Sequence, residues 1–559
     1  MKRKSALLFI ALLYLLPATA QITSVKLLTP KPVQYQKTEF DITLTAQWKN
    51  PYLQQDVTLD MQITTPVGKK LTLPCYYQQG ESGKPSIWKA RFAPQEKGKY
   101  AYQFVFSKTG KVSSTSKKGQ FTAAAAKGDG FLHVKDKWAL QFDNGKPFRG
   151  VAENICWESR DEDDSKYFKT LHESKKYNYE YMLRSFASNG GNFFRTWICR
   201  WNLPIDWQKG FNNSRYQPSK EYFNPSVVQK LDRLINLSDS LGLYIMLCMG
   251  PGAYNVHDGG FSPDAADFFV NSKSKQRYKD RLRYIVARWG YSTSIGAWEF
   301  FNEVDNVQFG NKEKPISGDS IVQWHDEMST YLKQLDPYGH IVTTSISHRD
   351  IKGLNSLKNI DINQKHIYKN TAIIPETVVK YEKEFDKPYV IGEFGYEYDW
   401  SKNFDDFAEG MDSDFKRGLW FGLFSPTPIL PMSWWWEYFD NRGTDAYYKR
   451  VRPISDMMLE AGKGNFESIE LKNIAKDITA YGVKCGGKMF VYLWNPASSA
   501  QQTEVSFAVA KSGNYTVKTY NCETGETSSV SKIIASNKTI NLPQQLGAVA
   551  DKVLIISAE

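Results

Sequence analysis

The sequence predicts an α/β protein in which a (β/α)8 TIM barrel stands between two β-sandwich domains, the first of them immunoglobulin-like. Three changes in the apolar pattern along the 559 residues indicate this architecture. Apolar and polar residues alternate up to about residue 123, short apolar runs then alternate with helical patterns, and simple alternation returns after about residue 462. We therefore expect a short leader at 1–20 and three domains, at 21–126, 127–462 and 463–559.

The first twenty residues predict a segment outside the folded domains. The basic residues of 2–4 precede an apolar run over 6–16, which ends at Pro17 and a small-x-small site at 18–20. These features are typical of a cleaved secretory signal peptide. No later segment reaches about 18 uninterrupted apolar residues, the length that a membrane-spanning helix needs. We expect a periplasmic or secreted protein without a membrane span.

Charge and composition narrow the class of partner. Lys and Arg outnumber Asp and Glu by 71 to 60, and the excess is spread along the chain. A nucleic-acid-binding protein would concentrate its basic residues on one element, so we expect no nucleic-acid partner, and an acidic polysaccharide is only weakly supported. Aromatic residues make up 14% of the chain and include 16 Trp, which supply flat surfaces for stacking on ligands.

Residues 21–126 predict the first β-sandwich. Alternation is clear at 39–48 and 99–106, and a turn-forming cluster stands at 80–85. Short strands at this spacing are typical of an immunoglobulin-like sandwich. The alanines of 123–126, followed by Lys-Gly-Asp-Gly, indicate a linker into the next domain.

Eight candidate strands predict the barrel. Helical patterns at 227–240, 278–289 and 321–335 separate some of them, and such alternation is typical of β/α units around a parallel sheet. Active sites of this fold lie at the carboxyl ends of the strands. The expected strands are 148–154, 192–197, 243–249, 296–301, 340–345, 361–368, 389–393 and 429–436.

The last domain and the cysteines leave one alternative open. Alternation at 488–494 and 513–520 predicts a second β-sandwich over 463–559. Six Cys are too few for a disulfide framework, and Cys485 and Cys522, which share this domain, fit either a disulfide or two thiols.

Three further cysteines lie near the ends of predicted barrel strands. Cys156, Cys199 and Cys248 do not have the spacing of a zinc motif, so we expect them to be buried free thiols.

Two carboxylates at the ends of predicted strands four and seven indicate the chemistry. Glu303 stands beside Asn302, and Glu393 ends the strand at 389–393. A carboxylate there can hold a raised pKa and give a proton to a leaving oxygen, while the amide anchors a substrate hydroxyl. Two such groups about 5 Å apart meet the requirement for hydrolysing an acetal by double displacement. Taken alone, either carboxylate also fits a cap that faces solvent.

These residues resemble those of clan A glycoside hydrolases. Asn302-Glu303 and Glu393 look like the conserved positions of the clan, and the run 283–292 is similar to family 5 members of the cellulase and mannanase type. The resemblance covers about 131–462. It implies an O-glycosyl hydrolase, endo-glycanase-like and retaining, that cleaves β-glycosidic bonds in a polysaccharide or oligosaccharide. It also implies Glu303 as acid/base, Glu393 as nucleophile and Asn302 as partner of the sugar 2-hydroxyl.

The resemblance extends to three more residues of the expected site. Arg195 ends predicted strand two, where the family keeps an arginine that stabilises the charge of the nucleophile. Because a buried arginine is costly without a partner, a carboxylate beside it is expected. His366 and Tyr368 match a His-x-Tyr pattern on strand six, which implies contacts of Tyr368 with the nucleophile and of His366 with the reacting sugar. A histidine satisfied within the core is the alternative for His366.

Tryptophans near the strand ends predict the sugar-binding surface, because sugar rings stack their C–H faces on indole. Along strand eight, alternation lets Trp434 and Trp436 share a side and puts Trp435 on the other. We expect Trp436, with Trp434, to form the floor of the site. Aromatic residues of earlier loops, which fit either outer subsites or the core, are Trp157, Trp197, Trp201 and Tyr254.

One departure from family 5 stands at the end of strand three. Members usually carry a histidine there, whereas this chain reads Cys-Met-Gly-Pro-Gly over 248–252. His257 in the following loop is the candidate to reach back and bind substrate in its place.

No metal or organic cofactor is expected, because no ligand spacing and no phosphate-binding glycine pattern is present. Two alternatives to an endo-acting enzyme remain. One is an exo-acting β-glycosidase or transglycosylase on the same barrel, and the other is a catalytically silent polysaccharide-binding protein. The sequence predicts no oligomeric state.

Overall fold

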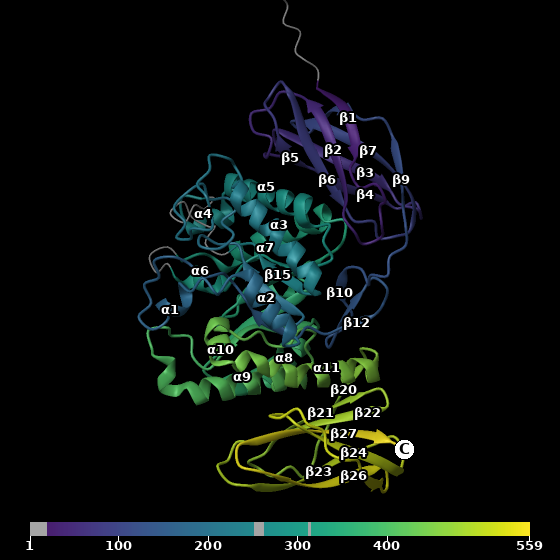
Figure 1. Ribbon diagram of the computed structural model, residues 1–559, viewed down its shortest axis with the longest axis vertical. Helices are drawn as coiled ribbons and strands as arrows, with labels where there is room; N and C mark the ends of the chain where they lie inside the picture. Colours follow the sequence, from purple (N-terminus) through teal and green to yellow (C-terminus); the bar gives the residue numbers. More distant parts are fainter. Residues whose placement is uncertain (1–19, 251–261, 311–314) are drawn as a thin grey trace, which may run out of the picture. The chain divides into compact units, whose positions relative to one another are not determined.

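The computed structural model describes residues 20–250, 262–310 and 315–559 (Figure 1). All but the last residue of the expected signal peptide lies outside this range. The chain forms two compact units: one runs up to Ala125 and includes 283–288, and the other consists of 126–282 and 289–559. Within the described residues, no helix combines the length and the apolar character needed to cross a membrane.

The N-terminal unit is a sandwich of two antiparallel sheets. Its strands are β1 Gln21–Leu27, β2 Thr38–Thr45, β3 Val57–Thr64, β4 Lys70–Pro74, β5 Tyr76–Gln79, β6 Pro85–Phe92, β7 Gly98–Lys108, β8 Lys111–Thr115 and β9 Gly119–Ala123. One sheet has the order β1-β2-β6-β5, and the other has β4-β3-β7-β8 with β9 also on β7. Alternation builds the core, because every second residue of β2, Phe40, Ile42 and Leu44, is fully buried.

Seven parallel strands, paired in sequence order, form most of the barrel. They are β13 Ala152–Asn154, β14 Phe193–Trp197, β15 Tyr244–Cys248, β16 Ile295–Glu299, β17 Ile341–Ile346, β18 Ile362–Tyr368 and β19 Tyr389–Gly395. Residues 429–433 close the circle as the expected eighth strand, but through isolated bridges, in which Ser433 pairs with both Glu153 and Phe394. The predicted TIM barrel with flanking β domains is thus confirmed.

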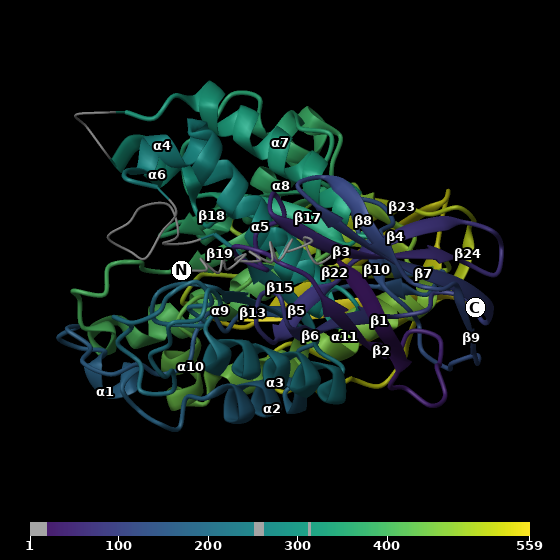
Figure 2. The same cartoon turned by 90° about the horizontal axis from the view of Figure 1, so that it is seen from above.

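The helices alternate with these strands as predicted. They are α1 Lys169–His172, α2 Tyr179–Ser188, α3 Pro225–Leu241, α4 Ala265–Val270, α5 Ser272–Trp289, α6 Val304–Gly310, α7 Gly318–Leu335, α8 Ile374–Phe385, α9 Ala408–Leu423, α10 Trp436–Arg442 and α11 Tyr448–Gly462. Local sequence sets the ends of α3: Asn224 caps its start, Pro225 takes the first position and Gly242 ends it at φ 67°. The neighbouring helices α2 and α3 lie side by side (Figures 1 and 2).

A small antiparallel sheet closes the amino-terminal end of the barrel. It consists of β10 Leu132–Val134, β11 Leu140–Phe142 and β12 Pro147–Phe148. Leu132, Leu140 and Phe142 share one buried cluster with Phe193 and Ile341, which begin their strands. The single strand expected at 148–154 is therefore wrong: its first residue belongs to this sheet, Gly150 pairs with Ile429 through an isolated bridge, and its last three residues form β13 of the barrel.

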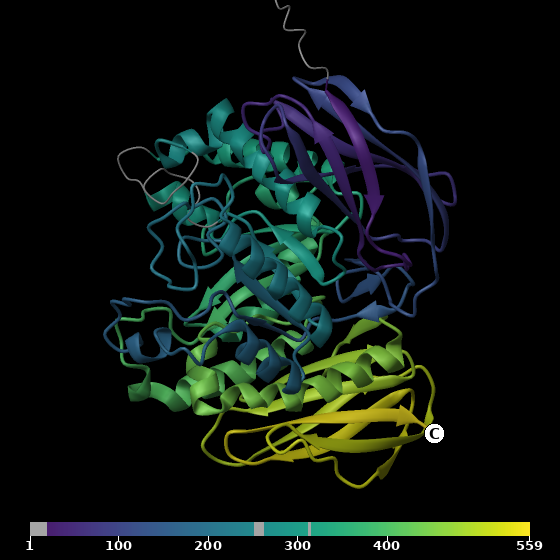
Figure 3. The same ribbon diagram turned by 45° about the horizontal axis from the view of Figure 1, so that its top comes forward.

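The C-terminal region is a second β-sandwich. Its strands are β20 Phe466–Ile469, β21 Thr479–Cys485, β22 Lys488–Asn495, β23 Gln501–Ala508, β24 Gly513–Asn521, β25 Ser531–Ala535, β26 Thr539–Leu546 and β27 Ala550–Ala558. Six of them form a sheet of order β20-β21-β22-β27-β24-β25, and β23 pairs with β26. In Figure 3 the green helices of the barrel lie along the yellow-green strands of this region. Trp420 of α9 stacks on Tyr492 of β22, with ring centroids 5.7 Å apart.

All six cysteines are buried free thiols. This confirms the expectation for Cys156, Cys199 and Cys248. It also decides the alternative left open for Cys485 and Cys522, which do not form a disulfide.

Candidate active site

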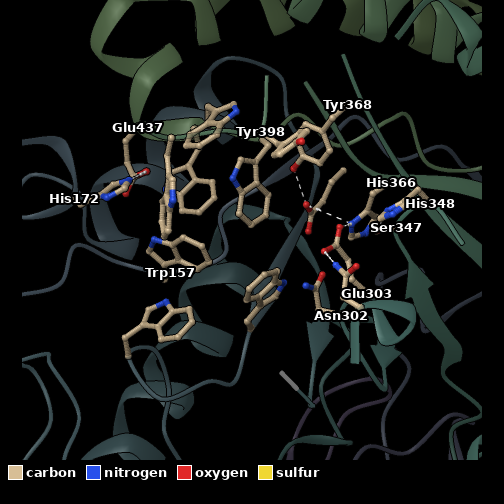
Figure 4. A pocket seen from close by; sticks show the side chains of 18 residues that line it. Trp157, His172, Asn302, Glu303, Ser347, His348, His366, Tyr368, Tyr398 and Glu437 are labelled. Carbon is tan, nitrogen blue, oxygen red and sulfur yellow. Dashed lines mark hydrogen bonds and ion pairs between the residues drawn. The ribbon is translucent and has the colours of Figure 1, made fainter. Parts of the chain in front are cut away.

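Most of the residues expected in the site meet in one pocket at the carboxyl ends of the barrel strands (Figure 4). The pocket has a volume of about 760 Å³. Arg195 lies below it and is fully buried, and His257 lies outside the described residues. The expected residues that line the pocket are Trp197, Asn302, Glu303, His366, Tyr368, Glu393, Trp434 and Trp436.

Glu393 is held by hydrogen bonds to both oxygens. It lies near the end of β19, where Arg195 Nη1 donates to Oε1 at 2.8 Å and the Tyr368 hydroxyl donates to Oε2 at 2.6 Å. Burial raises the pKa of Glu393, while the nearby His366 and Arg195 act in the opposite direction. The two hydrogen bonds fix the carboxylate and favour its charged form, which a nucleophile requires.

Arg195 is shared between two glutamates. Its Nε and Nη2 donate to the two oxygens of Glu299 at 2.6 and 2.9 Å, and its remaining bonds go to Glu393, Asn302 and Asn154. Sequence reasoning expected one carboxylate beside Arg195 and named Glu393. Glu299 is a second partner, which sequence reasoning did not pair with Arg195, because Glu299 continues the apolar run of β16; it is fully buried.

Glu303 stands on a bent loop directly after β16. Its φ is 50°, a left-handed conformation that is uncommon for a residue other than glycine and that occurs at functional sites. The hydroxyl of Ser345 on β17 accepts from its backbone N–H at 3.0 Å. The carboxylate accepts from Asn306 at 2.7 Å and contacts His366 Nδ1 at 2.8 Å.

The pKa of Glu303 is shifted opposite to the expected direction. Burial raises it, but the hydrogen bond and the charge of His366 outweigh burial, with smaller contributions from Arg195 and Asn306, and the net shift is downward. The expectation of a raised pKa is therefore wrong for the unliganded site. The same His366 Nδ1 lies 3.4 Å from Glu393, so the imidazole stands between the two carboxylates rather than in the core.

The side chain of Asn302 is oriented by Arg195. Its Oδ1 accepts from Arg195 Nη2 at 2.7 Å. Because the amide oxygen is used in this way, its NH2 group is the side that remains for a ligand in the pocket. A substrate hydroxyl is the group that this donor suits, as the sequence suggested.

Indole rings make up the opposite wall of the pocket. Trp157 lies at its centre, with ring centroids 5.3 Å from Trp197, 5.4 Å from Trp434 and 5.0 Å from Trp436. Trp201 joins the same cluster at 5.7 Å from Trp157. Of the early-loop aromatics considered from the sequence, three of four thus line the pocket, and Tyr254 lies outside the described residues.

Strand alternation is not what positions the last tryptophans. Trp435 has φ 70° and α10 begins at Trp436, so the chain has left the extended conformation by then. The indole of Trp435 stacks on Phe168 and donates to the Glu397 carbonyl at 2.7 Å. Trp434 and Trp436 still contact each other, with ring centroids 5.3 Å apart, on either side of the left-handed Trp435.

Several pocket residues were not found from the sequence. One signal was available, because aromatic residues occupy every second position over 396–400. The others come from loops and short helices, which only the fold brings to the pocket. These residues are His172, Asn306, Ser347, His348, Tyr398 and Trp400.

One group of side chains has the geometry to hold a cation. Within the described part of the chain, Glu303, His366 and Glu393 bring donor atoms within 4.8 Å of one another. Arg195 and Tyr368 already donate hydrogen bonds to the two oxygens of Glu393. These donors occupy positions that a cation would need, so the cluster suits acid–base chemistry better than metal binding.

Comparison with known proteins agrees with the site. Residues 160–413 match the family described as Cellulase (glycosyl hydrolase family 5), and residues 31–107 match a domain of unknown function, DUF5060. A mannan endo-1,4-beta-mannosidase A of Podospora anserina is 22% identical over 260 residues, which cover 39% of this chain and 64% of the relative. A mannan endo-1,4-beta-mannosidase 3 of rice is 26% identical over 182 residues, covering 29% and 35%. The chain spans 31% and 64% of the length of the curated relatives that it matches first.

Solved structures show the same fold. A crystal structure of a Bacteroides vulgatus protein superimposes with a TM-score of 0.63 at 16% identity and covers 95% of this chain and 100% of the other. A glycoside hydrolase family 5 protein of the same species has a TM-score of 0.52 at 13% identity and covers 77% and 94%. Taken with the paired glutamates, the family match identifies the barrel domain as a clan A glycoside hydrolase of the family 5 type.

Proposed function

We propose that this protein hydrolyses β-glycosidic bonds with retention at the anomeric carbon, with Glu303 as acid/base and Glu393 as nucleophile. The observation that carries the proposal is the approach of the two carboxylates, whose nearest oxygens lie within 4.8 Å. Retaining enzymes hold these groups about 5 Å apart, whereas inverting enzymes need about 6.5–9.5 Å to admit a water molecule.

The first step forms a covalent intermediate. An oxygen of Glu393 attacks the anomeric carbon as the bond to the leaving oxygen breaks, and Glu303 transfers its proton to that oxygen. In the second step, Glu303 removes a proton from water, which attacks the same carbon and releases Glu393. Asn302 supports both steps by donating to a hydroxyl of the reacting sugar.

Substrate binding must place the proton on Glu303. In the free site, burial favours the neutral form of Glu393, and His366 favours the charged form of Glu303. A sugar over the pair excludes water from Glu303 and brings a hydroxyl that can donate to Glu393. Both effects favour a neutral Glu303 and a charged Glu393.

A β-1,4-linked mannan is the first substrate to test. The named curated relatives are mannan endo-1,4-beta-mannosidases, and the wall formed by Trp157, Trp197 and Trp434 suits the C–H faces of neutral sugars. The electrostatically matched Glu303 and Glu393 argue against a silent binding protein, because binding alone does not need a nucleophile fixed by Arg195 and Tyr368.

The experiment is to incubate the protein with β-mannan, β-glucan and xylan and to measure new reducing ends. Turnover by the wild type, lost in Glu393→Gln, is expected. Glu409→Gln, the same chemical change on the exposed side of α9, should keep full activity. Binding without any reducing ends would favour the silent binding protein, and release of single sugars alone would favour an exo-acting enzyme.

A further inference from the structure

A second group of polar side chains stands at the end of the pocket away from the reacting carboxylates. Figure 4 shows His172 and Glu437 on one side of the pocket, and Glu303 with His366 on the other. His172 ends α1 and Glu437 lies in the first turn of α10, and each is only 3% exposed. Neither takes part in the double displacement.

The hydrogen-bonding capacity of this group is incomplete. His172 Nδ1 lies 3.1 Å from Asp163 Oδ2 and 3.3 Å from Arg160 Nη2, so these neighbours occupy Nδ1, and Nε2 is the ring nitrogen that remains for a ligand. That Nε2 faces Glu437 Oε2 across 4.0 Å, which is too far for a direct hydrogen bond. Glu437 Oε1 is buried and has no hydrogen-bond partner among the residues that the structure describes.

The group carries no net charge near neutral pH. Burial raises the pKa of Glu437 to about 8, with Arg160 opposing this shift and Asp163 and Asp440 adding to it. Burial and the adjacent Arg160 lower the pKa of His172 to about 4. The charge of Arg160 is balanced by Asp163, with which it forms an ion pair at 2.5 Å.

This arrangement suits a hydroxyl group and disfavours charged ligands. A hydroxyl can both donate and accept, so it can form hydrogen bonds to His172 Nε2 and to the neutral carboxyl of Glu437 at the same time. A carboxylate ligand finds no free cation, because Arg160 is paired with Asp163. An ammonium ligand finds no free anion, because Glu437 is neutral.

An aromatic ring stands beside the same end of the pocket. Trp400 lines it, with its ring centroid 6.4 Å from that of His172, and it is 47% exposed. An exposed indole next to a hydrogen-bonding pair is the composition of a sugar subsite, in which the ring stacks and the hydroxyl is fixed.

We propose that Glu437, His172 and Trp400 form a second subsite, which binds a hydroxyl-bearing neutral sugar unit of the same chain whose neighbouring unit reacts at Glu393. The inference rests on the proposed glycoside hydrolase function and adds to it a preference for oligosaccharides over single sugars. A single glycoside fills only the catalytic end, whereas a longer chain reaches both ends.

The test compares kcat/KM for β-1,4-manno-oligosaccharides of two to six units with kcat/KM for 4-nitrophenyl β-mannoside. The ratio of the two should fall about tenfold or more in Glu437→Met, which removes both polar atoms. Glu437→Gln, which keeps a neutral donor and acceptor, should keep the ratio within about threefold. Glu409→Met on α9 controls for the substitution itself. If Glu437→Met does not fold, His172→Phe replaces it.

Binding to an inactive protein separates this proposal from the function. In the Glu393→Gln background, calorimetry with the same oligosaccharides should show affinity that Glu437→Met reduces. If the wild type turns over normally but Glu437→Met changes neither the kcat/KM ratio nor the affinity, the subsite proposal alone is overturned. No wild-type turnover and no oligosaccharide binding would overturn both. Tighter binding of oligogalacturonides than of manno-oligosaccharides would show that the site takes carboxylates and would also overturn the proposal.

Discussion

Removal of a single oxygen from Tyr368 tests how the nucleophile is kept charged. The Tyr368 hydroxyl donates to Glu393 Oε2 at 2.6 Å and lowers the pKa of that carboxyl against the effect of burial. A hydrogen bond to a charged group contributes about 1.5–3 kcal/mol. At about 1.4 kcal/mol per pKa unit, Tyr368→Phe should raise the pKa of Glu393 by about 1–2 units.

The readout is the pH profile of kcat, which reports the substrate complex, on a manno-oligosaccharide whose leaving oxygen needs a proton. Because the active form needs a charged Glu393, the acidic limb should move up by about 1–2 pH units. The alkaline limb, which reports loss of the proton from Glu303, should stay in place. Tyr398→Phe is the matched control, since Tyr398 lines the same pocket and its ring contacts the Tyr368 ring. An acidic limb that moves by less than about 0.3 pH units would refute the assigned role.

Four further outcomes are expected. Glu393→Gln should lower the rate more than about a thousandfold with the fold intact by circular dichroism, and a variant that keeps a tenth of the activity would remove Glu393 from its role. Early NMR spectra of the released sugar should show retention, and net inversion would contradict double displacement. Glu303→Ala should accumulate the intermediate of a dinitrophenyl glycoside, and added azide should restore turnover as a glycosyl azide; lack of rescue would point to another acid/base. Because folding raises the pKa of Glu437 to about 8, its neutral form stabilises the folded protein. This contribution to the free energy of unfolding is complete below about pH 4.5 and is lost, at about 1.4 kcal/mol per pH unit, as the pH rises to about 8. Glu437→Gln should therefore gain in Tm over wild type through that window, and a constant Tm difference would count against a raised pKa.

The fold and the centre of the site were accessible from the sequence because they follow from periodicity. Eight apolar runs interrupted by helical patterns specify a parallel barrel, and the carboxyl ends of parallel strands meet at one edge. Glu393 and Arg195 stand at such ends, so they could be placed together without knowledge of any loop. The short sheet at the amino-terminal end of the barrel was not predicted, because 148–154 has the pattern of one strand although Phe148 pairs with Leu140 of β11 and Ala152 with Phe193 of β14.

The remainder of the site depends on tertiary structure. His172 and Glu437 come from α1 and α10, which are far apart in the sequence and approach only when the barrel closes. Trp435 has a left-handed backbone conformation. The sequence does not indicate it, because such a conformation is usually found at glycine or asparagine. The direction of the pKa shift of Glu303 could not be inferred either, because it depends on His366, which lies on another strand with its Nδ1 2.8 Å from the Glu303 carboxylate.

The sharing of Arg195 between two glutamates bears on the strength of the nucleophile. A carboxylate bonded to an unbalanced guanidinium is well fixed but weakly reactive, because the positive charge holds back the electron pair that must attack carbon. Glu299 engages the other edge of the guanidinium with two hydrogen bonds and balances its charge. Glu393 is therefore still oriented by its hydrogen bond to Arg195, but the positive charge of Arg195 stabilises its electron pair less strongly. Glu299, which is fully buried, therefore determines how firmly Glu393 is held and how reactive its attacking oxygen is.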